Sequence, residues 1–489
     1  MSDQIIAGGE AEGWRSTLAG LVAGPVETAA TPGYEQECDG FDRSVPQQPA
    51  VVVGAAAEPD IVAAVRFGRD HGLGVGVLAT GHGLTVPMSG GLLIGTRRLG
   101  GVAVDAAART ARVAAGATWA SVVTKAARSG LAPLCGAAPA VGAVSYTLGG
   151  GLGPLGRRYG FAADHVRQVD LVTADGELRQ VTPESFPDLF WAVRGGGGNF
   201  GIATSLVIDL FPVDTLYGGG LYLPGEAAAD VLPVFLACAR DAPDELTLSV
   251  ALMVFPHLEV IPPPLRGRFT CHVRVSYCGP PGQGQALIQP LRTAAPLLLD
   301  TIRVMPFTDV GTIHNDPAQP MATVSRALVL KQASQQTADV VLAATGPASP
   351  FLVELRQMGG ALRRPPSVPN SVGHRAGAFN VFAASYPSPA GLQEADQAEL
   401  RLADALQPWS DGGALVNFLA GPYVTPRHVR AAYPPAVFSR LTQIKTAWDP
   451  GNMFRFNHNI HPADPDVRIP ATGSSRAGPG ATADPVGKA

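Results

Sequence analysis

Three clusters of glycine within the first 201 residues constrain this chain more than any other feature. They occupy residues 80–83, 149–153 and 195–201, and each flanks a segment with the pattern of a β-strand. Glycine lets backbone amides approach an anion such as a phosphate closely, because no side chain intervenes. One cluster alone would be weak evidence, but three in one region predict a large ligand that is wrapped by backbone.

The composition indicates a chain with ample material for a large core. Of its 489 residues, 46% are hydrophobic and only 16% are charged, which suggests two or three domains. The formal net charge of −4 argues against a nucleic-acid coat or a polybasic membrane anchor. No apolar run reaches the roughly 18 residues of a membrane span. We therefore expect neither nucleic acid nor membrane as a partner.

The cysteines and the first residues bear on the compartment. The five cysteines are odd in number, scattered and without a CxxC pair, which favours reduced thiols. The start, Met1-Ser2-Asp3-Gln4, lacks the basic and apolar regions of a signal peptide. We expect a cytoplasmic protein with cysteines at Cys38, Cys135, Cys238, Cys271 and Cys278.

Short strands joined by tight links dominate the region up to residue 213. Glu58-Pro59-Asp60 places acid and proline at the start of a helix, where the helix dipole is positive, and Gly72 ends that helix. Ala174-Asp175-Gly176 predicts a hairpin turn. This layout is α+β, not a long βαβαβ series. The predicted strands span residues 51–53, 73–78, 92–95, 102–105, 109–115, 166–173, 177–181 and 202–211.

The glycine-rich loops thin out after residue 213, and the pattern changes to longer alternating strands at 246–254 and 269–277, mixed with helices. Two further helices and a dense loop close the fold, and the last residues are Pro, Gly, Ala, Ser and Thr, which predicts a flexible tail. The predicted parts are a first region at residues 1–213, a second domain at 214–424, a closing segment at 425–464 and the tail at 465–489.

One motif favours a different class of protein. Gly151-x-Gly153-x-x-Gly156 formally matches the dinucleotide-binding fingerprint of NAD-linked enzymes. Pro154 and the Arg157-Arg158 pair follow it, and no clear βαβ unit surrounds it. The NAD-linked reading stays open as an alternative. The chain has no HExxH metal motif and no GxSxG nucleophile elbow, and we expect no metal.

Several motifs in order resemble one family. Val77-Leu78-Ala79-Thr80-Gly81-His82-Gly83 resembles the phosphate loop of FAD-linked oxidases of the vanillyl-alcohol oxidase superfamily, whose FAD domain is of the p-cresol methylhydroxylase type. The resemblance is to the bacterial type of the berberine-bridge-enzyme-like group. It continues through residues 116–119, 141–153, 158–164, 188–194 and 201–204, and returns at 448–460.

The resemblance implies a fold and a cofactor. In this family a two-subdomain FAD-binding domain is split in sequence around a substrate domain, which is a large antiparallel sheet backed by helices. The loop at residues 80–84 would hold the FAD pyrophosphate, and Asn457 and Asn459 would approach the flavin ring. The remaining implied FAD contacts are Ala79, Thr80, Gly81, Gly83, Leu84, Val141, Gly142, Gly149, Gly150, Gly151, Gly153, Gly201 and Ile202.

The resemblance also implies how the flavin is attached and oxidised. The histidine after the loop glycine bonds covalently to the flavin 8α-methyl carbon in this family, which implies that role for His82. Many relatives carry a second link through a cysteine that aligns with Ala138, whereas Cys135 lies three residues too early. We therefore predict a single histidyl link, with a shifted loop that brings in Cys135 as the alternative. Valine at Val141 is associated in relatives with oxygen reaching the flavin, which favours an oxidase.

The usual catalytic base is missing. Many relatives have an Asn-Tyr pair before the closing helices, and the matching residues here are Asn417 and Phe418, which has no hydroxyl and cannot take a proton. Asn417 remains a candidate for orienting the substrate. Tyr146 and His374 are candidates to replace the base, and Tyr423 is a weaker one.

Together these features predict an FAD-dependent oxidase. It would transfer a hydride from a small or medium organic molecule (an alcohol, an amine or a polyketide-like specialised metabolite) to covalent flavin, and reduce O2 to H2O2. Family membership suggests natural-product biosynthesis. The first alternative is a flavin-dependent oxygenase or cyclase that causes an oxidative rearrangement. A non-catalytic flavin-binding protein is a further alternative.

Overall fold

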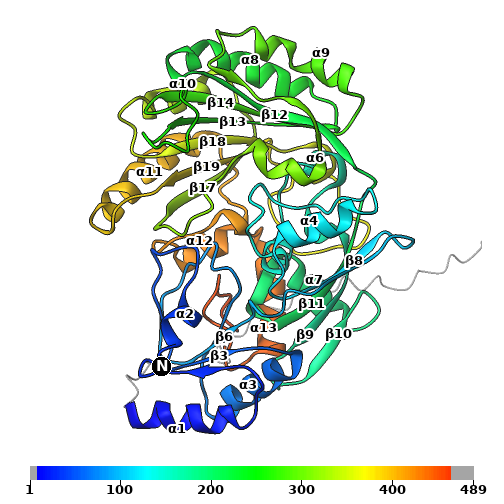
Figure 1. Cartoon of the computed structure of the whole chain (residues 1–489), viewed down its shortest axis with the longest axis vertical. Coiled ribbons are helices and arrows are strands. Elements are labelled where there is room, and N and C mark those ends of the chain that lie inside the picture. The colour runs from blue at the N-terminus through cyan, green and yellow to red at the C-terminus, as the bar shows by residue number, and fades with distance from the viewer. Residues whose placement is uncertain (1–7, 464–489) are drawn as a thin grey trace, which may run out of the picture.

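The structure is a computed structural model that describes residues 8–463 (Figure 1). The predicted flexible tail, 465–489, lies outside these residues. Within the described part of the chain, a four-stranded, a five-stranded and an eight-stranded sheet form the framework, with a two-stranded ribbon beside them. The α+β class with a large antiparallel sheet, predicted from the sequence, is confirmed.

The four-stranded sheet has the order β1-β3-β6-β4, and its last three strands are parallel. Its central strands are fully buried because hydrophobic residues occupy both faces. Helix α3 begins where the sequence predicted, and the Asp60 carboxylate accepts hydrogen bonds from the backbone N–H groups of Ala23 and Ala56. The elements are α1 (Gly8–Ala19), β1 (Val26–Glu27), α2 (Tyr34–Cys38), β3 (Val51–Gly54), α3 (Glu58–Asp70), β4 (Val75–Leu78) and β6 (Leu92–Gly95), with the ribbon β2 (Gln47–Gln48) and β5 (Met88–Ser89).

The five-stranded sheet is antiparallel, in the order β10-β9-β11-β8-β7. The predicted hairpin joins β9 to β10, with Leu178 opposite Val172. Helices α4 to α7 pack with this sheet around the fully buried Trp119 and Phe190. The elements are β7 (Val102–Asp105), β8 (Thr110–Ala114), α4 (Trp119–Ala127), α5 (Ala143–Leu148), α6 (Gly156–Tyr159), β9 (Val166–Val172), β10 (Leu178–Val181), α7 (Pro187–Gly196) and β11 (Ile202–Asp209).

The eight-stranded sheet has the order β15-β12-β14-β13-β18-β19-β17, and β16 pairs with β12. Helices α8 to α11 cover one of its faces, from the top to the left side of Figure 1, and bury alternate residues such as Val250 and Val353. The elements are β12 (Thr215–Pro224), α8 (Ala228–Asp241), β13 (Leu246–Val254), β14 (Phe269–Tyr277), α9 (Pro281–Arg292), β15 (Leu299–Asp300), β16 (Arg303–Pro306), β17 (Val324–Leu330), α10 (Gln335–Ala344), β18 (Leu352–Gln357), β19 (Phe379–Ser385) and α11 (Leu392–Leu406).

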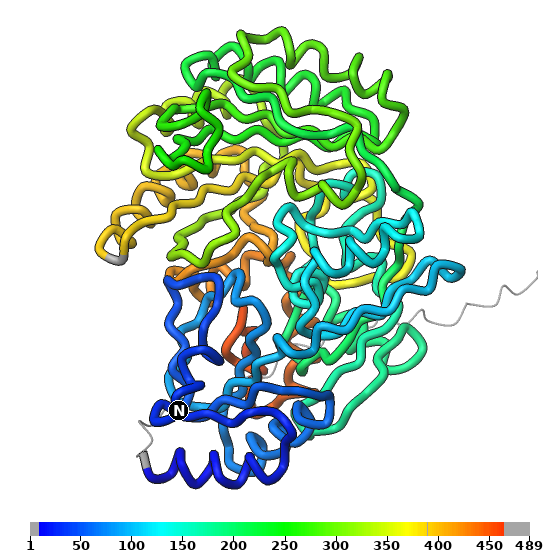
Figure 2. The backbone as a smooth tube through the Cα atoms, viewed as in Figure 1, coloured from blue at the N-terminus to red at the C-terminus, as the bar shows by residue number. Residues whose placement is uncertain are grey.

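The last described segment returns to the first sheet. Helices α12 (Pro426–Ala431) and α13 (Pro435–Trp448) lead into a loop whose Met453 carbonyl accepts a hydrogen bond from Val75 N–H at 2.9 Å. Figure 2 shows this orange-to-red segment running among the blue and cyan first part of the chain. The fully buried Lys445 ammonium holds the loop by donating to the Asn199 and Phe454 carbonyls and to Asp449. Residues more than 350 positions apart in sequence thus form one unit.

The fold bears on two features considered in the sequence, the dinucleotide-binding fingerprint and membrane-spanning segments. Gly151, which begins the dinucleotide-binding fingerprint, follows helix α5 and not a strand, so the fingerprint lacks the strand–turn–helix context it needs. Among the helices between residues 8 and 463, none is both long and apolar enough to cross a membrane.

Candidate active site

A cavity of about 490 Å³ lies between the glycine-rich part of the chain and the face of the eight-stranded sheet that is not covered by helices. Its wall combines residues from β4 and the loop after it, α5, the turn after α7, the sheet, and the closing loop. Thirteen of the residues singled out from the sequence line it: Ala79, Thr80, Gly81, His82, Gly83, Leu84, Val141, Tyr146, Gly149, Gly201, Ile202, Asn417 and Asn457.

The loop at residues 80–83 takes a shape that only glycine permits at two positions. Gly81 and Gly83 have φ angles of +73° and +69°, which residues with a Cβ rarely adopt. A Cβ on Gly81 would also lie 2.4 Å from the Gly40 Cα atom. The loop is held in place by the Phe41 N–H, which donates to the Thr80 carbonyl at 2.9 Å.

This loop presents His82 to the cavity. The imidazole stacks on the Phe41 ring with centroids 4.0 Å apart, and Nδ1 lies 2.9 Å from the Thr80 hydroxyl. Burial lowers the pKa of His82 to about 4, against a weaker opposing effect of the Asp316 charge. The ring is therefore neutral at pH 7. Its Nε2 atom is buried and has no hydrogen-bond partner among the described residues.

Other wall residues also leave room and unpaired polar atoms for a ligand. A Cβ built on Gly83 or Gly197 would meet nothing within 4 Å, and one on Gly198 would meet only the Asn457 amide at 3.9 Å. Buried polar atoms without a partner also include Asn457 Oδ1 and the Tyr146 hydroxyl. Since buried polar atoms are normally paired, this wall fits a large polar ligand such as FAD, held by backbone at close range.

Four predicted FAD contacts do not reach the cavity wall: Gly142, Gly150, Gly151 and Gly153. Protein packs closely against two of them, Gly151 and Gly153. A Cβ on Gly153 would lie 1.9 Å from the Cys135 carbonyl oxygen, and one on Gly151 would lie 2.6 Å from both Ala162 and the Tyr146 ring. Much of the second glycine cluster thus allows close packing of α5 and the segments after it, and the contact of these glycines with FAD stays a prediction.

Asn459 and Cys135 also stand back from the wall. Asn459 is not among the lining residues, although its Oδ1 atom is buried without a partner. Cys135 is buried, and burial raises the pKa of its thiol to about 12, so the thiol stays protonated. Ala138, by contrast, lines the cavity at the position where relatives carry their second link.

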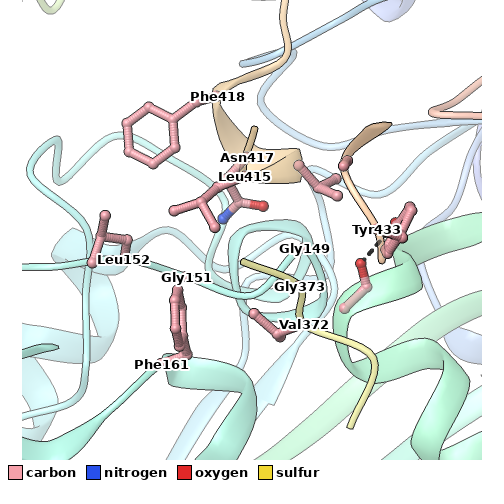
Figure 3. Close-up of a pocket in the computed structure, with 13 residues that line it drawn as sticks. Gly149, Gly151, Leu152, Phe161, Val372, Gly373, Leu415, Asn417, Phe418 and Tyr433 are labelled. Carbon is pink, nitrogen blue, oxygen red and sulfur yellow. Dashed lines mark hydrogen bonds between the residues drawn. The ribbon is translucent and has the colours of Figure 1, made fainter. Parts of the chain in front are cut away.

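Asn417 and Tyr146 lie together at one side of the cavity. The Asn417 amide donates to the Tyr146 carbonyl at 2.8 Å. Figure 3 shows Asn417 beside Gly149, at the end of α5. Burial raises the pKa of Tyr146 well above its usual value. The phenol therefore stays protonated, which suits a hydrogen-bond donor and not a base.

His374, a candidate base from the sequence, lies elsewhere in the structure. It is not among the residues that line the cavity. Its Nδ1 pairs with the Asp411 carboxylate at 2.8 Å, and its Nε2 with the Ala431 carbonyl at 2.8 Å. Because both ring nitrogens are occupied, His374 joins two loops and has no free position for a substrate proton.

The sequence reasoning missed the polar side chains that the large sheet contributes to the wall. Arg274 of β14, and Glu354 and Arg356 of β18, line the cavity on the side opposite the glycine loops. The sequence did carry a signal for them. In β14 and β18 every second residue is polar, which predicts one face of the sheet that packs against helices and one that presents polar side chains. His458 of the closing loop, which also lines the cavity, was missed as well.

Comparisons with known proteins agree with this geometry. Residues 49–182 match the family described as FAD binding domain, and residues 416–461 the family described as berberine and berberine like. The chain is 27% identical over 446 residues to (R)-6-hydroxynicotine oxidase of Paenarthrobacter nicotinovorans, which covers 88% of this chain and 95% of the relative.

Solved structures share the fold over nearly the whole chain. The crystal structure of 6-hydroxy-D-nicotine oxidase from Arthrobacter nicotinovorans superposes with a TM-score of 0.78 at 25% identity, covering 90% of this chain and 98% of that one. A berberine-bridge-enzyme-like protein of Physcomitrella patens gives a TM-score of 0.79 at 18% identity, covering 91% and 98%.

The fold, the cavity and these similarities define an FAD-dependent oxidoreductase. Its two matched domains and its fold are similar to those of the berberine-bridge-enzyme-like group of the vanillyl-alcohol oxidase superfamily.

Proposed function

We propose that this chain is an oxidase that holds FAD through one covalent bond to His82 and oxidises a small or medium organic substrate. The observation that carries the proposal is the His82 side chain itself: a neutral imidazole in the wall of the cavity, with a buried Nε2 atom that has no partner. A neutral imidazole is a good nucleophile near pH 7.

The wall residues divide the work of holding the cofactor. Thr80 and the loop glycines would hold the pyrophosphate. Gly197 and Gly198 leave room for the cofactor to approach the backbone, and Asn457 would offer its unpaired Oδ1 atom to the flavin ring. Bound FAD would accept a hydride from the substrate and pass the two electrons to O2, giving H2O2. Val141 on the wall supports the use of O2, by analogy with relatives.

The side chains near the substrate end favour chemistry that needs no strong base. Phe418 lines the cavity in place of the usual tyrosine. Tyr146 is a protonated donor, and Asn417 already donates to a backbone carbonyl. His458 Nε2 lies 2.7 Å from the Leu419 carbonyl, so Nε2 carries the proton, and burial lowers the pKa of the ring. Its Nδ1 lone pair is therefore the neutral proton acceptor that we assign to an alcohol or amine substrate.

Acid precipitation of the purified protein tests the covalent link. A yellow pellet is expected from the native protein, and His82→Ala should move the colour to the supernatant. His71→Ala is the matched control, because His71 also stacks on a phenylalanine, Phe67, with centroids 3.9 Å apart, but lies outside the cavity wall. A colourless pellet from native protein that binds FAD would refute the link, and protein without FAD would refute the function.

The absence of a tyrosine at Phe418 also favours a second function, a flavin-dependent oxygenase or cyclase that causes a rearrangement. Turnover under ¹⁸O2 separates the two, because an oxygenase places the label in the product, whereas an oxidase releases it as peroxide. The name of the relative from Paenarthrobacter nicotinovorans, an oxidase, supports the first function.

We also propose that the enzyme acts in the cytoplasm on a specialised metabolite. All five cysteines are free, which suits a reducing compartment. The role in natural-product biosynthesis rests on similarity to this group. Cell fractionation with an antibody against the chain tests the location, and recovery with secreted protein would contradict it.

A further inference from the structure

A row of polar side chains crosses the face of the eight-stranded sheet that borders the cavity. Ser249 of β13 is directly opposite both Arg274 of β14 and Arg356 of β18 in the strand register. Directly paired residues share a face of the sheet, and so does Glu354, two positions from Arg356. The two arginines and the glutamate line the cavity.

This row is buried and tightly paired. The Glu354 carboxylate forms an ion pair with an Nη of Arg274 at 2.9 Å and accepts a hydrogen bond from an Nη of Arg356 at 2.9 Å. The side chains of Glu354, Arg274 and Arg356 are only 4%, 6% and 11% exposed. Burial alone would raise the pKa of Glu354, but the charges of Arg356 and Arg274 outweigh it and hold that pKa well below its usual value. Glu354 is therefore ionised, with its oxygens occupied by arginine.

The neighbouring histidines add no charge. Burial lowers the pKa of His272 well below its usual value, and its Nδ1 accepts a hydrogen bond from Arg274 Nε at 3.3 Å. Burial also lowers the pKa of His314, whose Nε2 lies 3.5 Å from Glu354. Two guanidinium groups and one carboxylate thus leave one excess positive charge in a buried setting, where it is expensive without a counter-ion.

The same row has unused hydrogen-bonding groups. The Ser249 hydroxyl, between the two arginines, and the His314 ring nitrogens are buried without a hydrogen-bond partner. The guanidinium group of Arg356 has no hydrogen-bonded partner other than Glu354 among residues 8–463. Its guanidinium lies 5.3 Å from the Phe418 ring centroid, and the Phe382 ring meets Phe418 edge-on. The Arg356 guanidinium can therefore donate to a further, negatively charged acceptor, at a place where two aromatic rings lie close by.

Two other carboxylates line the cavity, Asp42 and Asp316. Asp42 is buried beside Gly81 of the glycine loop, and its Oδ1 atom accepts hydrogen bonds from the Ser44 N–H and hydroxyl, so its charge is already satisfied there. Asp316 is exposed, and its charge acts on both Arg356 and His82. An exposed carboxylate stays hydrated and is screened by salt, so it weakens the excess positive charge of the buried row without cancelling it.

We infer that the substrate of this oxidase is a carboxylate with an apolar or aromatic body, bound by Arg356 with Arg274 beside it. This inference rests on the proposed function. The planar guanidinium offers paired N–H donors that match a carboxylate, which balances the charge of the row. The Phe382 and Phe418 rings contact the apolar body. A cationic substrate would meet an excess of like charge and no free oxygen on Glu354.

Calorimetric titration of the FAD-loaded full chain tests this, with benzoate as the anionic probe and benzamide as its neutral counterpart. We expect benzoate to bind at least tenfold more tightly than benzamide. Arg356→Gln should remove this preference, and Arg356→Lys, which keeps the charge without the fork, should retain part of it. Asp316→Asn should strengthen benzoate binding severalfold. Equal binding of both probes, or full preference in Arg356→Gln, overturns the inference.

Arg326→Gln is the matched control. Arg326 is also a poorly exposed arginine of this sheet, on β17, but it pairs with Asp396 of α11 on the helix-covered face. It should keep the benzoate preference. The flavin absorbance of the same samples, which reports bound FAD, distinguishes a failure of the proposed function from a failure of the proposed substrate class. A preparation without FAD that still prefers benzoate contradicts the proposed function alone, whereas one with FAD and no preference contradicts the substrate class alone.

Discussion

Replacing Gly149 by alanine should destabilise the protein through a single contact. Gly149 ends α5 with φ −81° and ψ 0°, which alanine adopts without strain. A Cβ there would lie 1.7 Å from Asn417 Oδ1 and 2.9 Å from Asn417 Cγ (Figure 3). No backbone cost is added, so the whole effect comes from this overlap.

The expected loss of stability depends on what happens to Asn417, which either shifts away from the new methyl group or is itself replaced by alanine. If Asn417 shifts, the strain of overpacking costs about 1–3 kcal/mol, and its hydrogen bond to the Tyr146 carbonyl is at risk. Asn417→Ala alone loses that hydrogen bond, which is about 1 kcal/mol. In the double variant the alanine at 149 meets no amide, so we expect its free energy of unfolding to match that of Asn417→Ala within about 0.5 kcal/mol.

Urea unfolding of the four apoproteins (native, two single variants and the double variant) measures this coupling. Gly198→Ala is the control, because Gly198 has φ −74° and its Cβ would meet only the Asn457 amide at 3.9 Å. It should unfold like the native apoprotein but carry less FAD, because it lines the cavity. Additive losses from Gly149→Ala and Asn417→Ala would refute the packing role of the second glycine cluster.

Three further predictions concern other buried groups. Cys135→Ala should leave the acid-precipitated pellet yellow, because the thiol stands off the cavity wall. Lys445→Met should lower the free energy of unfolding by about 3–5 kcal/mol, because it leaves the buried Asp449 carboxylate without its cation. Burial raises the pKa of Glu399 to about 8, above its unfolded value of about 4.5. The stability from this group is therefore complete below pH 4.5 and is lost as the pH rises toward 8, and Glu399→Gln should remove that loss.

Each of these has a clear contrary result. A colourless pellet from Cys135→Ala would mean that the thiol reaches the flavin. Native-like urea unfolding of Lys445→Met would mean that the closing loop does not depend on this ion pair. For Glu399, unfolding at pH 5 and pH 8 is compared in native protein and variant, and an equal pH dependence in both would contradict the assignment.

The local elements could be predicted from the sequence because their signals are local. The alternating strands at 246–254 and 269–277 appear as β13 and β14 with the same bounds, and Glu58-Pro59-Asp60 begins α3. The glycines of the loop after β4 were informative for the same reason, since a positive φ depends on the residue itself. The family motifs then predicted the cofactor class.

What the sequence by itself determined is the main strands before residue 213, the two strands β13 and β14 of the large sheet, the glycine loop that carries His82, and the α+β class. Only the tertiary structure decided which residues share the cavity. His374 is tied to Asp411 and Ala431, and the arginines of β14 and β18 meet Glu354 across the sheet. The physical reason is that strand register and the return of the closing segment join residues far apart in sequence, whereas propensity and turn chemistry act over only a few neighbours.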